Sequence, residues 1–200
     1  MQVRSVSFDT SFLLKNNRLI DKIIKNLSQD VIPCFVTSTV VSELEQLKVW
    51  GRISSEEYHR AYRRIKNANG TVIDFKNQLL SSAFGKECID SMEKHHGVKE
   101  KDIVNDCNIL VAVLKKGVDI FLSEDFHFTS KITKEVINEV KNVACSEYHQ
   151  MCGTHLYNID HLTFLKAYYN GNIDLDIIKN SLKSIRKKGK IYGKNQDIDP

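Results

Sequence analysis

The chain of 200 residues is 42% hydrophobic and 27% charged, a balance typical of a soluble globular protein with one substantial core. The longest apolar run, Ile109 to Leu114, is too short to cross a bilayer, and Arg4 and Asp9 interrupt any secretory signal at the start, so we expect a cytoplasmic protein. The net charge of +4 permits a polyanionic partner without requiring one.

The first predicted strand, over residues 3–8, leads into the stretch SFDTSFLL and its single carboxylate, Asp9. One interpretation is that Asp9 caps a helix that begins near Ser11, and this segment taken alone favours it. The other is that Asp9 handles a metal or a phosphate, because open α/β sheets bind ligands just outside the carboxyl ends of their strands. Acids elsewhere in the chain must decide between the two.

Glu43 lies in a helix predicted over residues 38–50, which follows a polar helix over 19–27 and a second strand over 30–37. A capping box would need Ser or Thr at position 40, which is Val40, so capping does not explain Glu43. On a helical wheel Glu43 lies at the rim of the buried stripe, whereas Glu45 points to another side. We therefore take Glu43 as a functional acid and Glu45 as a surface residue.

Two segments concentrate positive charge. The next predicted helix, over 54–68, contains the stretch YHRAYRRIK, and residues 183–194 hold six basic residues and no acid. Such segments can line a phosphate track, although a solvated helix face and a cationic tail explain each of them equally well. The residues predicted to contact nucleic acid are Arg60, Arg63, Arg64, Lys187 and Lys188.

Asp106 belongs to a strongly apolar helix predicted over residues 101–116. On the helical wheel it falls between Leu110 and Val113, inside the apolar face. A carboxylate there is costly unless it is paired or coordinates a metal, and a buried salt bridge is the alternative to a metal. Asp102, one turn earlier, is either the helix cap or a peripheral fifth acid.

The other predicted elements complete an alternating pattern. They are strands over 71–75, 118–125 and, weakly, 154–159, and helices over 78–96, 134–142 and in two closing segments. Strands that alternate with helices at this spacing predict an α/β fold with a parallel sheet and helices on both faces. Asp9 and Asp125 each follow a predicted strand, so both would emerge at the same edge of that sheet.

Carboxylates gathered at one edge would repel one another unless a hard cation lay between them, because the segments that carry them offer no partner lysine or arginine. Ligands that are all oxygen indicate Mg²⁺ or Mn²⁺. Such an ion binds phosphate oxygens, lowers the pKa of a bound water and stabilises an in-line displacement at phosphorus. The pattern therefore favours a phosphodiester as the substrate.

Three stretches, SFDTSFLL, VVSELEQL and NDCNILVAVLKKGVDIFLSEDFHF, resemble the motifs of PIN-domain ribonucleases, particularly the VapC-like toxin nucleases of toxin–antitoxin pairs. The resemblance covers residues 3–128, and reaches 165 if IDHLTFL matches the last helix of the family. It implies a three-layer α/β/α sandwich, which we expect over residues 1–165. Beyond it, the sequence itself predicts a basic helical extension over 166–200. Toxin nucleases are usually shorter, so residues 50–99 and the basic tail are either RNA-binding additions or the mark of a different branch.

The resemblance also implies the site and its partners. Asp9, Glu43, Asp106 and Asp125 match the metal-binding and catalytic acids, and Thr10 and Ser123 match residues that support the acids by hydrogen bonds. The implied activity is cleavage of RNA with Mg²⁺ or Mn²⁺, and the implied partners are RNA, an antitoxin protein and a second copy of the chain in a homodimer.

Three other interpretations account for parts of the sequence. A haloacid-dehalogenase-type phosphatase needs a second Asp two residues after the first, and position 11 is Ser11. A non-catalytic PIN-like module would bind RNA or protein without cutting, but the presence of all four acids argues against it. A zinc module could use four soft ligands whose spacing fits no standard finger: Cys145, His149, Cys152 and His155.

The chain has five cysteines, an odd number with no framework spacing. This pattern suits free thiols in a reducing compartment, and we expect no disulfides.

Overall fold

The computed structural model describes residues 3–75, 82–97 and 99–169. Within these ranges five strands form one sheet in the order β3-β2-β1-β4-β5, and every neighbouring pair is parallel. The strands are β1 (Val6–Phe8), β2 (Cys34–Thr37), β3 (Thr71–Ile73), β4 (Ile120–Leu122) and β5 (Tyr157–Ile159). The predicted α/β fold with a parallel sheet is confirmed.

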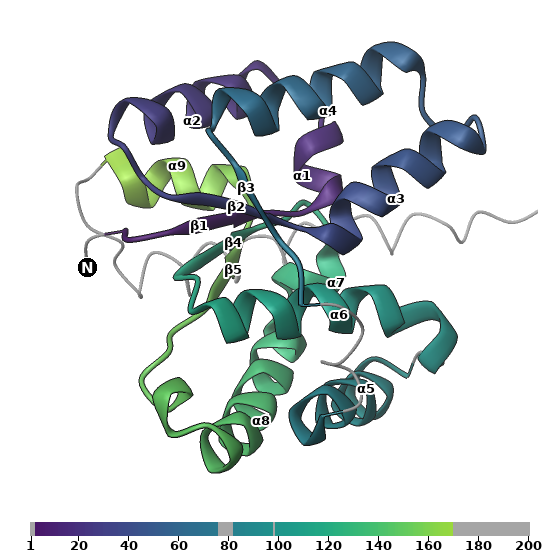
Figure 1. The fold of residues 1–200 in the computed structure, drawn as a ribbon, viewed down its shortest axis with the longest axis vertical. Coiled ribbons are helices and arrows are strands. Elements are labelled where there is room, and N and C mark those ends of the chain that lie inside the picture. Colours follow the sequence, from purple (N-terminus) through teal and green to yellow (C-terminus); the bar gives the residue numbers. More distant parts are fainter. Residues whose placement is uncertain (1–2, 76–81, 98, 170–200) are drawn as a thin grey trace, which may run out of the picture.

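Helices cover both faces of the sheet (Figure 1), an arrangement compatible with a three-layer sandwich. On one side lie α2 (Arg18–Gln29), α4 (Ser55–Asn67) and α9 (His161–Tyr169), and on the other α5 (Ala83–His96), α6 (Glu100–Lys116) and α8 (Lys131–Glu147). The remaining helical elements are α1 (Thr10–Leu14), α3 (Ser38–Val49), α7 (Phe126–Thr129) and the 3₁₀ turn η1 (His149–Met151). Of the helices in the described ranges, none has the length and apolar character needed to cross a membrane.

The central strands β1 and β4 are buried on both faces, which explains the uninterrupted apolar sequence of β4 and the apolar residues Val6 and Phe8 on either side of the buried Ser7 in β1. The chain runs outward from β1 through β2 to β3, then returns so that β4 pairs with the other side of β1. The boundary between β1 and β4 is therefore the point at which the strand order reverses. Open α/β sheets bind ligands outside the carboxyl ends of the strands at such a point.

The predicted elements differ from the observed ones mainly at their ends. The second strand begins at Cys34 rather than at residue 30, because Val31 has a positive φ of 54° that no strand accommodates. The short helix α1 begins after its N-cap Asp9, as the capping interpretation predicts, whereas α7 and η1 are not among the predicted elements. The start of the predicted helix 78–96, the second closing helix and most of the predicted extension 166–200 lie outside the described residues, and α9 runs through position 165 without a break.

The buried side of α4 contains a charged residue, Arg64, whose exposed fraction is 2%. Its guanidinium pairs with Asp21 at 2.8 Å and donates hydrogen bonds to the carbonyl oxygens of Leu13 at 2.7 Å and Lys15 at 2.8 Å. These contacts tie α4 to the connection between α1 and α2. The prediction that Arg64 contacts nucleic acid is wrong, because its donors are already used inside the fold.

Cys145 and Cys152 form a disulfide, which corrects the expectation that the chain has none. The η1 turn after α8 folds the chain back and brings the two Cα atoms within 4.5 Å, a distance that a disulfide spans. Bonded sulfurs cannot act as thiolate ligands, so the zinc set proposed from sequence is not assembled. The other three cysteines are free and buried.

Candidate functional site

Asp9 lies at the carboxyl end of β1, where its backbone N–H donates to the carbonyl oxygen of Leu122 in β4 at 2.9 Å. It is the N-cap of α1, and its side chain accepts a hydrogen bond from the backbone N–H of Ser11 at 3.3 Å. The carboxylate also lines a cavity of about 230 Å³ at this edge of the sheet. The two interpretations of Asp9 are therefore compatible, since one residue caps the helix and faces the cavity.

All four predicted acids line this cavity although they come from four separate segments. Glu43 comes from α3, Asp106 from α6, and Asp125 follows β4 as the N-cap of α7. The complete lining is Asp9, Thr10, Ser11, Leu14, Glu43, Leu47, Asp106, Asp125 and Phe128. No lysine, arginine or histidine belongs to this lining within the described part of the chain.

Hydroxyl groups fix the orientation of the acids. Ser123 Oγ donates to Asp9 Oδ2 at 2.8 Å and accepts from the backbone N–H of Asp125 at 3.0 Å, so it links two of them. Thr10 Oγ1 donates to Glu43 Oε2 at 2.5 Å. Ser11 Oγ, which the sequence analysis did not single out, donates to Asp9 Oδ2 as well. Its position two residues after an N-cap Asp was the signal for that contact.

The electrostatics of the cavity disfavour ionisation. Burial, and to a lesser degree the Glu43 charge, raise the pKa of Asp9 to about 6, although hydrogen bonds from Ser11 and Ser123 lower it. Burial also raises the pKa of Asp106 to about 7, helped by the charges of the other three acids. Without a cation, the cluster holds protons near neutral pH that isolated carboxyl groups would release.

The donor set suits a hard divalent ion, because carboxylate and hydroxyl oxygens are the ligands that Mg²⁺ and Mn²⁺ prefer. The acids line the cavity, but their carboxylates do not converge on one point. In residues 3–75, 82–97 and 99–169, no group of three or more His, Cys, Asp or Glu is arranged to hold an ion directly. Mg²⁺ usually keeps several waters and needs only one or two carboxylates. The cavity thus fits an ion that is held partly through water.

The remaining predicted residues lie elsewhere. Asp102 is exposed and absent from the lining of the cavity, and Lys99 rather than Asp102 is the N-cap of α6. Arg63 is exposed, whereas Arg60 donates to the carbonyl oxygen of Leu14 at 3.3 Å. Lys187 and Lys188 lie outside the described residues.

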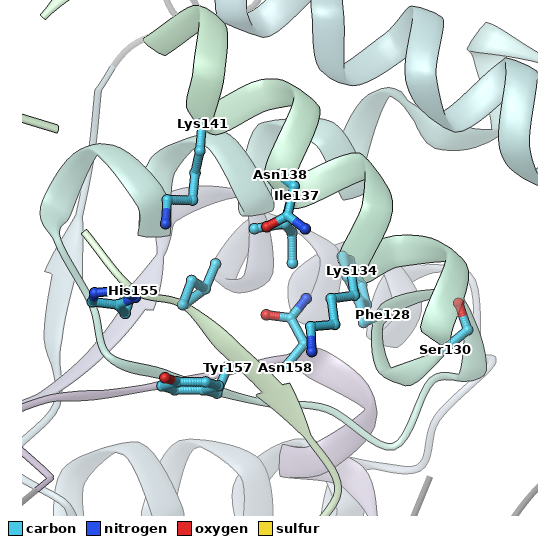
Figure 2. A pocket seen from close by; sticks show the side chains of 10 residues that line it. Phe128, Ser130, Lys134, Ile137, Asn138, Lys141, His155, Tyr157 and Asn158 are labelled. Atoms are coloured by element: carbon cyan, nitrogen blue, oxygen red, sulfur yellow. The ribbon is translucent and has the colours of Figure 1, made fainter. Parts of the chain in front are cut away.

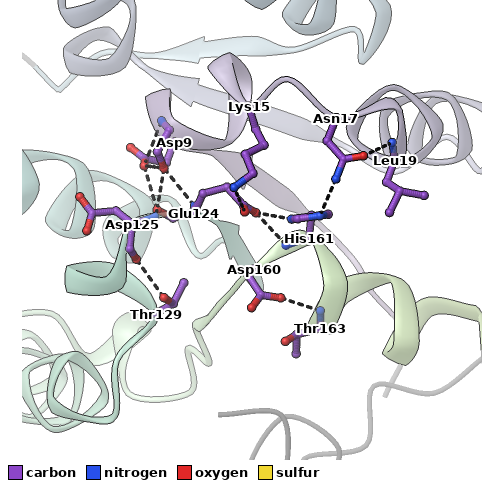
Figure 3. A network of polar contacts seen from close by, with 12 residues as sticks. Asp9, Lys15, Asn17, Leu19, Glu124, Asp125, Thr129, Asp160, His161 and Thr163 are labelled. Carbon is purple, nitrogen blue, oxygen red and sulfur yellow. Dashed lines mark hydrogen bonds and ion pairs between the residues drawn. The ribbon is translucent and has the colours of Figure 1, made fainter. Parts of the chain in front are cut away.

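A buried polar network that sequence reasoning missed supports the loop between Ser123 and Asp125 (Figure 3). Glu124 Oε1 lies 2.7 Å from His161 Nδ1 and accepts from the His161 backbone N–H at 3.0 Å. Burial raises the pKa of Glu124, but the hydrogen bonds from His161 and the charge of Lys15 outweigh it and lower the pKa overall. The Glu124 backbone N–H donates to Ser11 Oγ at 2.9 Å, which connects the network to the acids.

The ring of His161 has a defined tautomer in this network. Asn17 Oδ1 accepts from the backbone N–H of Leu19 at 2.9 Å, so its Nδ2 group is the donor to His161 Nε2 at 3.1 Å. A neutral ring that accepts at Nε2 carries its proton on Nδ1, which donates to Glu124. The network joins α9 and the start of α2 to the loop that carries Asp125, and so holds that acid against the sheet.

Comparisons of the chain with protein-family models, with curated proteins and with solved structures each give no match. The fold and the side chains themselves define the class: a parallel α/β protein with four carboxylates in one cavity at the point where its strand order reverses.

Proposed function

We propose that the protein is a divalent-metal-dependent ribonuclease of the PIN-domain type, which cleaves RNA phosphodiester bonds by means of a metal-activated water. The observation that carries the proposal is the gathering of Asp9, Glu43, Asp106 and Asp125 in one cavity whose described lining contains no basic residue. Four buried or half-buried carboxylates without a counter-charge are costly, and a hard cation offsets that cost.

In this mechanism Asp9, Asp106 and Asp125 would hold Mg²⁺ or Mn²⁺, partly through water. The ion, when bound, supplies a water of lowered pKa and offsets the charge that develops on the phosphoryl group. Glu43, oriented by Thr10, either completes the ion's shell or accepts a proton from the attacking water. Ser123 keeps Asp9 and Asp125 in register with each other.

The wider role follows from the same resemblance. A toxin of a toxin–antitoxin pair would have an antitoxin partner, and homodimerisation and a cytoplasmic location are part of the proposal. The Cys145–Cys152 disulfide counts against one argument for that location, which was the expectation that all thiols are free.

The direct test is an RNA-cleavage assay with wild type, Asp106→Asn and Asp102→Asn. Asp102 is the matched control because it lies one turn earlier in α6 but is exposed and outside the cavity. We expect wild type and Asp102→Asn to cleave RNA with Mn²⁺ and to stop in EDTA, and Asp106→Asn to lose at least about a hundredfold in rate. Cleavage that persists in EDTA, or at full rate in Asp106→Asn, would exclude the proposal.

A non-catalytic module that binds RNA or protein is the second candidate. A metal-binding experiment, combined with the cleavage assay, distinguishes it from the ribonuclease. If Mn²⁺ raises the melting temperature of wild type but not of Asp9→Asn, the cavity binds the ion, because a ligand specific to the folded state must stabilise it. Metal binding without RNA cleavage would favour the non-catalytic module. If the protein neither binds the metal nor cleaves RNA, the four acids do not have the role proposed here.

A further inference from the structure

A second cavity, of about 220 Å³, lies between α8 and the edge strand β5 (Figure 2). Its lining is Phe128, Ser130, Lys134, Ile137, Asn138, Lys141, His155, Leu156, Tyr157 and Asn158. Phe128 of α7 also lines the acidic cavity, so the two cavities are neighbours. The second cavity contains none of the four acids and needs its own explanation.

Asn158 carries the clearest signal in this cavity. Both polar atoms of its side chain, Nδ2 and Oδ1, are buried, and neither has a hydrogen-bond partner in the described part of the chain. Figure 2 shows the amide among the side chains that α8 contributes to the lining. A buried amide without partners costs free energy on both its donor and its acceptor side. A ligand that presents an acceptor beside a donor would satisfy both.

The charge of the cavity is positive. Lys134 and Lys141 project from α8, and His155 precedes β5 (Figure 2). Neither lysine forms an ion pair with any described residue, and no acid is part of the lining. Unpaired lysines around a concave surface attract an anion, most simply a phosphate group.

We propose that this cavity binds a single nucleotide, with the base edge on the Asn158 amide and the phosphate against Lys134 and Lys141. Nucleobase edges present an acceptor next to a donor, which is the pattern that an Asn side chain reads in two hydrogen bonds. Phe128, Ile137 and Leu156 supply apolar walls for the base. The volume is below the range of about 300–1,000 Å³ of drug-sized ligands, so the cavity takes the base and leaves the phosphate at the rim, where Lys134 is exposed.

The nucleotide is either free or one unit of an RNA strand whose neighbouring phosphodiester lies in the acidic cavity. The second source rests on the proposed ribonuclease function, whereas the first is independent of it. Both sources require the same contacts with Asn158 and the two lysines, and the experiment distinguishes them.

The test is calorimetric titration of the full chain in EDTA, which removes metal chemistry from the measurement. The probes are the four ribonucleoside 5′-monophosphates, the four nucleosides and inorganic phosphate. We expect at least one monophosphate to bind, and its nucleoside and phosphate alone to bind about tenfold more weakly or worse. Asn158→Ala should weaken the binding of the monophosphate by about tenfold and leave the binding of inorganic phosphate unchanged.

Variants of α8 test the phosphate contacts without touching the core. Lys134→Ala and Lys141→Ala should each weaken the binding of both the monophosphate and inorganic phosphate. Lys131→Ala is the control and should change neither affinity, because Lys131 is exposed on the same helix and absent from the lining. If Asn158→Ala fails to melt cooperatively, the lysine variants still test whether the nucleotide binds in this cavity. No binding of any monophosphate at about 1 mM, or binding that is unchanged in both lysine variants, would overturn the proposal.

Binding of a fluorescent single-stranded oligoribonucleotide in EDTA then identifies the source. If the monophosphate displaces the oligonucleotide and Lys141→Ala weakens both, the cavity holds a unit of the RNA strand. If the monophosphate binds without displacing the oligonucleotide, the cavity takes a free nucleotide. These results do not depend on whether Asp106→Asn abolishes cleavage, so the two proposals fail separately.

Discussion

Replacing Asp106 by Asn should stabilise the metal-free protein at alkaline pH, although it removes a residue of the candidate site. Burial, followed by the charges of Asp9, Asp125 and Glu43, raises the Asp106 pKa from 3.8 to about 7. At about 1.4 kcal/mol per pKa unit, ionising this carboxyl group in the folded protein costs on the order of 4 kcal/mol. Asn has a similar shape and cannot ionise, so the variant avoids that cost.

The pH dependence has a definite sign. The folded protein keeps the Asp106 proton up to about pH 7, whereas the unfolded chain releases it near 3.8, so between these values the folded state binds more protons. Its stability therefore falls as pH rises through this window. From pH 5 to pH 8 the loss assigned to Asp106 is about 3 kcal/mol, and the Asp9 pKa of about 6 adds a contribution of the same sign.

The assay is urea denaturation of wild type, Asp106→Asn and the exposed control Asp102→Asn in EDTA at pH 5 and pH 8. We expect the free energy of unfolding of Asp106→Asn, measured relative to wild type, to be about 3 kcal/mol higher at pH 8 than at pH 5. Asp102→Asn should have the same pH dependence as wild type. With Mn²⁺ at about 100 times its dissociation constant, wild type should gain about 2.7 kcal/mol and Asp106→Asn much less. Equal pH dependence of wild type and Asp106→Asn would refute the electrostatic reasoning.

Three further predictions concern other parts of the molecule. Arg64→Ala should lower the free energy of unfolding by about 3–5 kcal/mol in urea melts, because it leaves Asp21 and buried carbonyl groups unpaired, whereas Arg63→Ala should stay within about 0.5 kcal/mol; equal effects would contradict the burial of Arg64. Ser123→Ala removes a hydrogen bond that lowers the Asp9 pKa, so the acidic limb of the pH–rate profile for RNA cleavage should move to higher pH, and an unmoved limb would count against this role. Alkylation of the denatured, unreduced chain should modify three of the five cysteines by mass spectrometry, and modification of all five would show that the disulfide is absent.

Helical periodicity located the half-buried acids because a carboxylate inside an apolar stripe is conspicuous. Applied to α4, the same argument would have shown that Arg64 is internal. Ala61, Arg64, Ile65 and Ala68 are spaced as one buried face, and all four are buried. The prediction of a nucleic-acid contact rests on the basic composition of this stretch, and composition does not distinguish an arginine that faces solvent from one that binds carbonyl groups.

Other features depend on contacts that no local pattern encodes. The Glu124–His161 hydrogen bond joins residues 37 positions apart, and its existence depends on β5 pairing with β4. The cysteines of the disulfide meet only because α8 ends in the η1 turn. The parallel sheet, by contrast, follows from the alternation of apolar strands and amphipathic helices, which is spread along the whole described chain.

The distribution of usable cations predicts which face of the protein a polyanion would approach. Arg60 and Arg64 donate to backbone carbonyl oxygens of the α1 segment, so the exposed cations of α4 are Arg63 and Lys66. On α8, Lys134 and Lys141 have no ion-pair partner in the described ranges and line a cavity that shares Phe128 with the acidic cavity. An RNA strand held at the acids would therefore place its neighbouring phosphates along α8.

The salt dependence of oligoribonucleotide binding in EDTA tests this direction. The binding constant falls as salt rises, and each phosphate contact that is lost reduces the magnitude of the slope of log K against log salt by about 0.7 for a single strand. The double variant Lys134→Ala/Lys141→Ala should lower the slope by about 1.4, whereas Arg63→Ala on α4 should leave it unchanged. A reversed result, with the slope sensitive to Arg63 and not to the lysines, would place the strand along α4, because only groups that displace counterions from the phosphates change this slope.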